Sequence, residues 1–181
     1  MLRHAGFVAK MNRDELAATV GGNLNSYEEV IDAARFAARE GRVCIVTLGA
    51  DGALVVEPGQ AWRVTPPEVT AHSAVGSGDA FAAGLIAGIV RRQSIIEACT
   101  WAAACGAANA MTDLAGHLSR DDAESLRRRV RVEPVRRCGR KRAFRTASGT
   151  AAQPRIRGRT LSHGHGESGA HVQPLTRSPA R

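Results

Sequence analysis

A run of apolar and β-branched residues, R-V-C-I-V-T-L from Arg42 to Leu48, most constrains the fold of this chain. A near-continuous apolar run of this length is typical of a strand that is buried on both faces of a sheet. Helical patterns precede and follow it, so short strand-like runs alternate with longer amphipathic ones along the sequence. This alternation predicts an α/β fold in which helices flank a central sheet.

Two helices are expected before this strand. The first follows a short strand around Phe7–Ala9, and Asn12 is its predicted N-cap, with Glu15 placing negative charge in the positive first turn. The second helix begins after Ser26, which can also cap, and repeats apolar residues at helical spacing. Gly41 stands where a C-terminal glycine is expected.

The segment after the strand is expected to continue the alternation. Glycines at turn positions predict a hairpin, and Pro66 and Pro67 end it. The later elements are predicted as follows: a helix over Ala80–Val90, a second over Ile95–Met111, a third capped by Ser119 or Asp121, and a short final run R-V-R-V-E-P.

Charge divides the sequence into two parts. Residues 1–135 contain 14 basic and 16 acidic residues, whereas residues 136–181 contain 11 basic and 1 acidic, so the formal net charge of +8 belongs to the tail. The tail has only five residues among Leu, Ile, Val and Phe, too few to offset the entropy of ordering it. We therefore predict one domain over residues 1–135 and a disordered, Arg-rich tail over residues 136–181.

The basic tail raises the question of a nucleic-acid or membrane-surface partner, because clustered positive charge attracts phosphates. Phe144 is the only aromatic residue there, which gives stacking on bases little support. We interpret the charge as incidental and expect neither partner. The oligomeric state is left open by the sequence.

Cysteines and apolar runs bear on location. Cys44, Cys99, Cys105 and Cys138 form no C-x-x-C pair, which argues against a zinc site and favours buried, reduced thiols. No apolar run approaches the ~18 to 20 residues of a membrane span, and the N-terminus lacks the apolar core of a signal peptide. A cytoplasmic location is expected.

The stretch V-G-S-G-D-A-F leads from a glycine-rich turn into an apolar helix. First-turn amides have no intrahelical acceptor and the helix dipole is positive there, so Gly76, Ser77 and Gly78 are expected to bind an anion. A carboxylate at Asp79 makes sense beside an anion if it takes a proton from an attacking hydroxyl. The alternative is that Asp79 only caps or favours the N-terminus of the Ala80–Val90 helix.

Four segments in order resemble the PfkB family of ribokinase-like carbohydrate kinases. V-A-K-M-N-R-D-E-L is similar to the K-P-N-x-x-E-L segment, V-T-L-G-A-D-G-A-L to the S/T-L-G-x-x-G turn, and S-A-V-G-S-G-D-A-F-A-A-G to the second signature of the family. A-C-G-A-A-N-A-M-T-D-L-A-G-H-L resembles the 1-phosphofructokinase and tagatose-6-phosphate kinase branch. Met11 and Ala74 depart from the usual residues.

The resemblance implies a role for each matching residue. Asp79 would be the catalytic base, and Gly76, Ser77 and Gly78 would form the anion hole for the γ-phosphoryl group of ATP. Asn12 and Glu15 would help to arrange Mg²⁺ through water. The nucleotide would be bordered by Lys10, Asn12, Thr47, Gly49, Asp51, Gly52 and, near the adenine end, Asn109.

The resemblance also implies a fold and an activity. It covers only the C-terminal half of the three-layer α/β/α family fold, so we expect a truncated chain, as from a fragmentary or frameshifted gene. The implied function is ATP-dependent transfer of the γ-phosphoryl group to a hydroxyl of a sugar phosphate. The alternative is an inactive remnant that still binds nucleotide.

Overall fold

The computed structural model describes residues 7–39 and 42–136. Within them the chain forms one five-stranded sheet of order β1-β2-β3-β4-β5. β1 and β2 are parallel, and every other neighbouring pair is antiparallel. The strands are β1 (Val8–Asn12), β2 (Val43–Thr47), β3 (Ala53–Glu57), β4 (Gln60–Thr65) and β5 (Arg131–Pro134).

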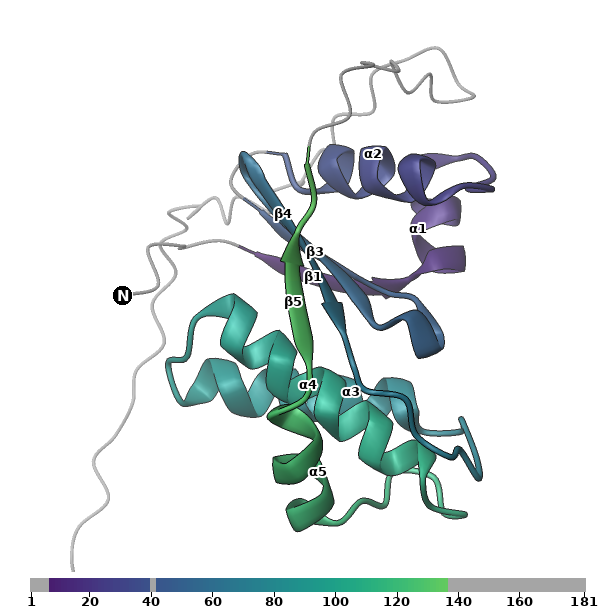
Figure 1. Cartoon of the computed structure of the whole chain (residues 1–181). Helices are drawn as coiled ribbons and strands as arrows, with labels where there is room; N and C mark the ends of the chain where they lie inside the picture. The colour runs from purple at the N-terminus through teal and green to yellow at the C-terminus, as the bar shows by residue number, and fades with distance from the viewer. Residues whose placement is uncertain (1–6, 40–41, 137–181) are drawn as a thin grey trace, which may run out of the picture. The chain divides into compact units, whose positions relative to one another are not determined.

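Helices lie on both sides of this sheet, as Figure 1 shows, with α1 and α2 on one side and α3, α4 and α5 on the other. The predicted α/β/α arrangement is confirmed. The helices are α1 (Arg13–Val20), α2 (Tyr27–Ala37), α3 (Ser77–Val90), α4 (Ile95–Ala110) and α5 (Arg120–Arg127), with a short 3₁₀ turn at Gly49–Asp51.

Strand β2 is buried on both faces, as its sequence predicts. Cys44 and Val46 pack into the core shared with α1 and α2, whereas Val43 and Ile45 pack into the core shared with α3 and α4. Because side chains alternate between the two faces of a strand, this one apolar run contributes to both hydrophobic cores.

The predicted N-caps are confirmed for three helices. Asn12 and Ser26 each form a capping box with the glutamate three residues later, and Ser119, rather than Asp121, caps α5. These contacts satisfy amides that have no acceptor within the helix. Helix α2 ends at Ala37, and Gly41, its predicted C-terminal glycine, lies outside the described residues.

Helix α3 begins at Ser77, so the prediction that it starts at Ala80 is wrong. Its N-cap is Gly76, which has a left-handed backbone with φ of 83°, and the amide of Ala80 donates to the Gly76 carbonyl at 2.9 Å. The residues expected to form an anion-binding loop therefore form the first turn of the helix.

Helices α3 and α4 pack at very short range because α3 carries glycines where they meet. A Cβ atom added at Gly88 would lie 2.7 Å from the Cα atom of Ala98, and one at Gly84 would lie 3.0 Å from the Cα atom of Ala102. Since real Cβ atoms do not approach so closely, these positions require glycine for the observed packing.

Three of the cysteines, Cys44, Cys99 and Cys105, are free and buried, which confirms the expectation for them; Cys138 lies outside the described residues. Burial raises the pKa of Cys44 to about 11, that of Cys99 to about 12 and that of Cys105 to about 11. Thiols with such values are protonated near neutral pH and are poor nucleophiles.

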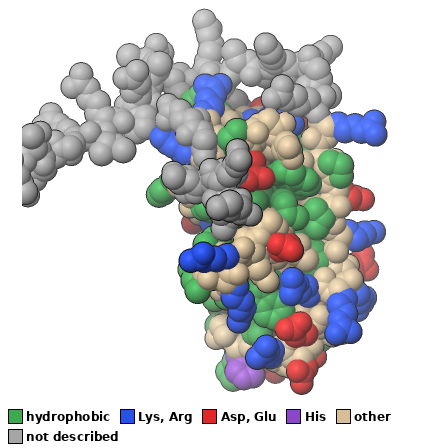
Figure 2. Space-filling model, turned by 90° about the vertical axis from the view of Figure 1, so that its left-hand side faces the viewer, with side chains coloured by type: hydrophobic (Ala, Val, Ile, Leu, Met, Phe, Trp, Pro, Cys, Tyr) green, Lys and Arg blue, Asp and Glu red, His purple; other side chains and the backbone are tan. Residues whose placement is uncertain are grey.

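On the face drawn in Figure 2, basic and acidic side chains are intermixed rather than gathered by sign. None of the helices in residues 7–39 and 42–136 is long and apolar enough to cross a membrane. The predicted tail over residues 136–181 lies, apart from Arg136, outside the described residues.

We predict that Gly88→Val lowers the free energy of unfolding by about 1–3 kcal/mol, the usual cost of overpacking a close-packed core. Urea unfolding followed by circular dichroism measures the change. Ala83→Val is the control, because Ala83 is exposed on the same helix. Equal stability of Gly88→Val and the unaltered chain would contradict the packing described above.

We predict that the three buried thiols react with a thiol reagent only after the chain unfolds. In a Cys138→Ser background at pH 8, reaction should be slow in buffer and fast in denaturant. Because the folded thiols keep their protons, stability should decrease as pH rises above about 8.5, where unfolded thiols ionise. A thiol that reacts equally fast in both conditions would be inconsistent with its burial.

Candidate functional site

A cleft of about 970 Å³ lies between the turn that joins β2 to β3, the segment that follows β4, the start of α3 and one side of α4. The α4 side is formed by small residues, so a flat group can lie against the helix backbone. The sequence-predicted residues in its lining are Thr47, Gly49, Asp51, Gly52, Ser77 and Gly78, and the small α4 residues are Ala103, Gly106, Ala107 and Ala110.

The turn between β2 and β3 forms one wall of the cleft. Gly52 has φ of 86°, and a Cβ atom there would lie 2.0 Å from the carbonyl oxygen of Val64. The Leu48 amide donates to the Gly52 carbonyl at 2.8 Å, which closes the turn. Glycine is therefore required for this turn to lie against β4. Glycine is also the residue expected where the main chain must approach a ligand closely.

The first turn of α3 forms the end of the cleft. A Cβ atom at Gly76 would lie 2.5 Å from the amide nitrogen of Gly116, so only glycine fits at this N-cap. Gly76 has no side chain that could accept from the first-turn amides, and the Ser77 amide donates to the Ala74 carbonyl at 3.2 Å. The amides of Gly78 and Asp79 are thus available to an anion.

Lys10 brings a positive charge to this helix end. Its Nζ atom lies 3.9 Å from the position that a Cβ atom of Gly78 would occupy. The ammonium group comes from β1 and the amides come from α3, so two elements distant in sequence converge on one point. A positive dipole end beside an ammonium group is suited to phosphate oxygens.

Asp79 is the third residue of α3, and its side chain is exposed. Gly76 is the N-cap, so Asp79 does not cap the helix, but its charge lies in the first turn, where it favours the helix N-terminus as the alternative allows. Its carboxylate stands beside amides that can hold an anion. That juxtaposition is what proton transfer next to a phosphoryl group requires.

Asn12 and Glu15 contact each other directly. The Glu15 amide donates to Asn12 Oδ1 at 2.8 Å, and the Asn12 amide donates to Glu15 Oε2 at 2.7 Å. The structure therefore gives both residues a helix-capping role, and their predicted role around Mg²⁺ remains a prediction. In the part of the chain that the structure describes, no three acidic, His or Cys side chains form a metal cluster.

Asn109 is fully buried and joins α4 to α3. Its Oδ1 atom accepts from the Ser77 hydroxyl at 3.2 Å, and its Nδ2 atom donates to the carbonyls of Leu114 at 3.2 Å and His117 at 2.8 Å. It lies behind the anion-binding turn and is not among the cleft-lining residues. Its predicted contact with adenine remains untested, and the structure shows a positioning role.

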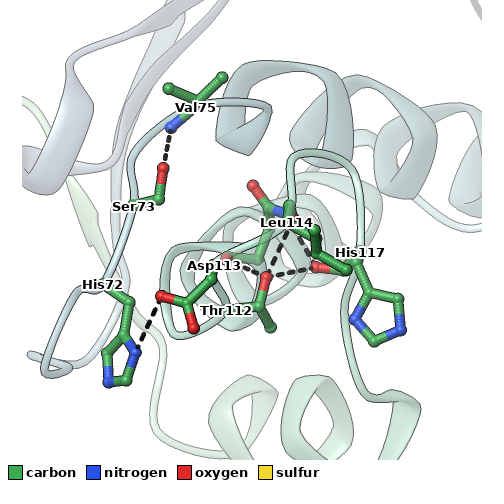
Figure 3. Close-up of polar contacts among 8 residues, drawn as sticks. His72, Ser73, Val75, Thr112, Asp113, Leu114 and His117 are labelled. Atoms are coloured by element: carbon green, nitrogen blue, oxygen red, sulfur yellow. Dashed lines mark hydrogen bonds and ion pairs between the residues drawn. The ribbon is translucent and has the colours of Figure 1, made fainter.

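Two loops beside the helix start are fastened to the end of α4 (Figure 3). The amides of His72 and Ser73 donate to the carbonyl of Ala110 at 2.7 and 3.2 Å. His72 Nδ1 lies 3.4 Å from Asp113 Oδ1, which joins the two loops side by side. This network fixes the path of the chain into Gly76.

Three arginines in the cleft lining were missed by sequence reasoning: Arg63, Arg129 and Arg131. Arg63 Nη2 lies 3.1 Å from Asp51 Oδ1, so one of them is paired with a residue of the predicted nucleotide turn. No local sequence pattern identifies these arginines as cleft residues. Their proximity depends on the pairing of β4 with β5, in which Thr65 is the partner of Arg131.

The layers and the site define an α/β protein with a cleft of about 970 Å³ that ends at the N-terminus of α3, where first-turn amides have no acceptor within the helix. Residues 2–120 match the pfkB family carbohydrate kinases. The chain therefore belongs to this family, and the resemblance seen in its motifs is confirmed.

Individual relatives agree with this assignment. The 1-phosphofructokinase of Escherichia coli K12 is 33% identical over 134 residues, which are 74% of this chain and 43% of that protein. The ATP-dependent 6-phosphofructokinase isozyme 2 of Mycobacterium tuberculosis H37Rv is 35% identical over 120 residues, 65% of this chain and 35% of its own. Phosphofructokinase-2 of Escherichia coli with potassium is 28% identical, with a TM-score of 0.65, over 68% of this chain and 40% of that one.

The chain thus spans less than half the length of these relatives. The family match over residues 2–120 includes β1, the first turn of α3 and the cleft-lining residues other than Arg129 and Arg131.

We predict that Asn109→Ala lowers the free energy of unfolding by about 1–3 kcal/mol, because it removes the three hydrogen bonds of a fully buried amide. Amide hydrogen exchange over residues 111–118 should become faster. Ser77→Ala removes only one of these bonds and should cost less. Asn23→Ala, at an exposed asparagine, is the matched control, and an equal effect there would argue against the network.

Proposed function

We propose that this chain provides the nucleotide-binding and phosphoryl-transfer half of an ATP-dependent phosphosugar kinase. The observation that carries the proposal is the convergence of Lys10 and the first-turn amides of α3 at the end of the cleft, with Asp79 beside them. The cleft accommodates the adenosine part of ATP, and the helix terminus holds the γ-phosphoryl group.

In the proposed reaction the acceptor hydroxyl oxygen forms a bond to the γ-phosphorus, and the bond from that phosphorus to the β–γ bridging oxygen breaks. Asp79 takes the hydroxyl proton, and ADP leaves with the bridging oxygen. Lys10 and the amides of Gly78 and Asp79 stabilise the charge on the transferring group. When bound, Mg²⁺ supplies further neutralisation of phosphate charge, and Asn12 and Glu15 are the residues proposed to orient its waters.

The names of the relatives support a fructose phosphate as the acceptor, since they are a 1-phosphofructokinase and a 6-phosphofructokinase isozyme. Tagatose 6-phosphate belongs to the same chemical class and is the other acceptor that we propose to test.

A second candidate function is nucleotide binding without phosphoryl transfer. Two observations favour it: Asp79 is exposed, and the chain spans 43% of the Escherichia coli 1-phosphofructokinase. An acceptor sugar needs a protein surface opposite Asp79. In the relatives, the part of the chain that is not matched here is long enough to form such a surface. The two candidates share the cleft and differ only in turnover.

We predict that Asp79→Asn lowers phosphoryl transfer by about 10²- to 10⁴-fold, as expected for loss of a general base, while ATP affinity changes little. Lys10→Gln should weaken ATP binding. ADP release with fructose 1-phosphate, fructose 6-phosphate or tagatose 6-phosphate measures transfer, and calorimetry measures ATP binding.

Asp14→Asn is the matched control, because Asp14 is an exposed aspartate in the first turn of α1, away from the cleft. Turnover that survives Asp79→Asn would overturn the assignment of the base. ATP binding that depends on Lys10, with no turnover of any acceptor, would establish the second candidate. ATP binding insensitive to Lys10→Gln would refute the site itself.

A further inference from the structure

Two arginines of the cleft lining have no part in the proposed phosphoryl transfer. Arg129 lies just before β5 and Arg131 is the first residue of β5, and both are exposed. Within residues 7–39 and 42–136, neither side chain forms an ion pair or a hydrogen bond. The family match ends at residue 120, so it gives neither arginine a role. The cleft therefore contains two guanidinium groups that have donors without acceptors.

The acidic residues near these arginines do not neutralise them. Asp51 and Glu68 are the acidic residues of the lining. Asp51 is engaged by Arg63, whose Nη2 atom lies 3.1 Å from Asp51 Oδ1 and whose guanidinium lies over the Tyr27 ring, 5.4 Å from its centroid. Glu133 is the strand partner of Arg63 and does not line the cleft. Glu68 is thus the one lining carboxylate left against two guanidinium groups, and this part of the cleft keeps a net positive charge.

A hydroxyl group stands beside Arg131. Thr65 is the partner of Arg131 in the pairing of β4 with β5, and it also lines the cleft. Side chains of directly paired antiparallel residues share one face of the sheet, with Cβ atoms about 5 Å apart. The Thr65 hydroxyl and the Arg131 guanidinium can therefore donate to the same bound group. A guanidinium matches two oxygens of a phosphate group, which makes phosphate the best-fitting anion.

These donors lie far from the proposed site of the γ-phosphoryl group. That site contains Lys10 of β1, and β1 and β5 are at opposite edges of the sheet. Four strand spacings of about 4.8 Å separate the two main chains, which gives about 19 Å. One phosphate group cannot contact both places, so positive charge is present near each end of the cleft.

We propose that Arg129, Arg131 and Thr65 bind a second phosphate group, at the end of the cleft away from α3. This rests on the proposed function for the position of the nucleotide, whose terminal phosphate lies at α3 and whose adenosine part extends toward β5. The second phosphate has two sources: an ester on the ribose of the nucleotide, or a free phosphate ion bound beside the nucleotide. Both present the same chemistry to the arginines, and the experiment distinguishes them.

Calorimetry at low salt measures the affinity of the full chain for ADP and for ADP with a further phosphate on the ribose 2′ or 3′ oxygen. If the second phosphate is an ester, one of these two forms should bind about tenfold or more tightly than ADP, as expected for a charge-assisted contact. If it is a free ion, inorganic phosphate should bind to the chain saturated with ADP. In either case the double substitution Arg129→Gln and Arg131→Gln should remove the effect.

Arg128→Gln is the matched control, because Arg128 is an exposed neighbour in sequence that does not line the cleft. Circular dichroism establishes that each variant is folded. Equal affinity for all three nucleotides, together with no binding of inorganic phosphate, overturns the proposal. An equal effect of Arg128→Gln also overturns it, as does phosphate binding that is lost in Lys10→Gln and kept in the double variant.

The experiment separates this proposal from the proposed function. If ADP does not bind at all, the proposed function fails. Inorganic phosphate added to the chain without nucleotide then tests the arginine site alone: binding that requires Arg129 and Arg131 supports the site, and binding that does not require them, or no binding, refutes it.

Discussion

The short-range packing of α3 on α4 is the interaction on which the site depends. Gly84 and Gly88 let the two helices approach, and a Cβ atom at Gly106 would already lie 3.2 Å from the carbonyl oxygen of Ser77. Since the helices run this close, the buried amide of Asn109 reaches the Ser77 hydroxyl. The direction of the first-turn amides, and so the place where an anion binds, follows from that contact.

Small residues on α4 serve two requirements. They permit the close approach of α3, and three of them, Ala103, Gly106 and Ala107, also line the cleft with surface that a flat group can contact. An alanine removes little apolar area from water when buried, so these helices gain less from burial than leucine-rich ones. Tight packing and the apolar strands beneath them compensate, because the apolar residues of β2 and β3 are almost fully buried.

Much of the fold could be predicted because its signals are local. Asn12 and Ser26 each cap a helix by contacting the residue three positions later, and the continuous apolar run of β2 itself indicates that this strand is buried. The start of α3 could not be predicted, since the left-handed Gly76 is fixed by its contact with Gly116, far along the chain.

The same distinction applies to the site. The glycine-rich turns and Asp79 were predicted as motifs, but the bond between Asn109 and Ser77 joins residues 32 positions apart. The arginines of the cleft lining come from strands β4 and β5 and from the segment before β5. Such groups become neighbours only when the strands of the sheet pair. The periodicity of a sequence does not indicate which strands pair with each other.

The proposed anion site joins two elements that are distant in sequence. Lys10 belongs to β1, and the amides of Gly78 and Asp79 belong to the first turn of α3. Strand β1 is held by its parallel pairing with β2, and β2 places Val43 and Ile45 in the core shared with α3 and α4. The distance between the ammonium group and the amides therefore depends on core packing that no ligand touches, and a small displacement there would weaken the proposed site.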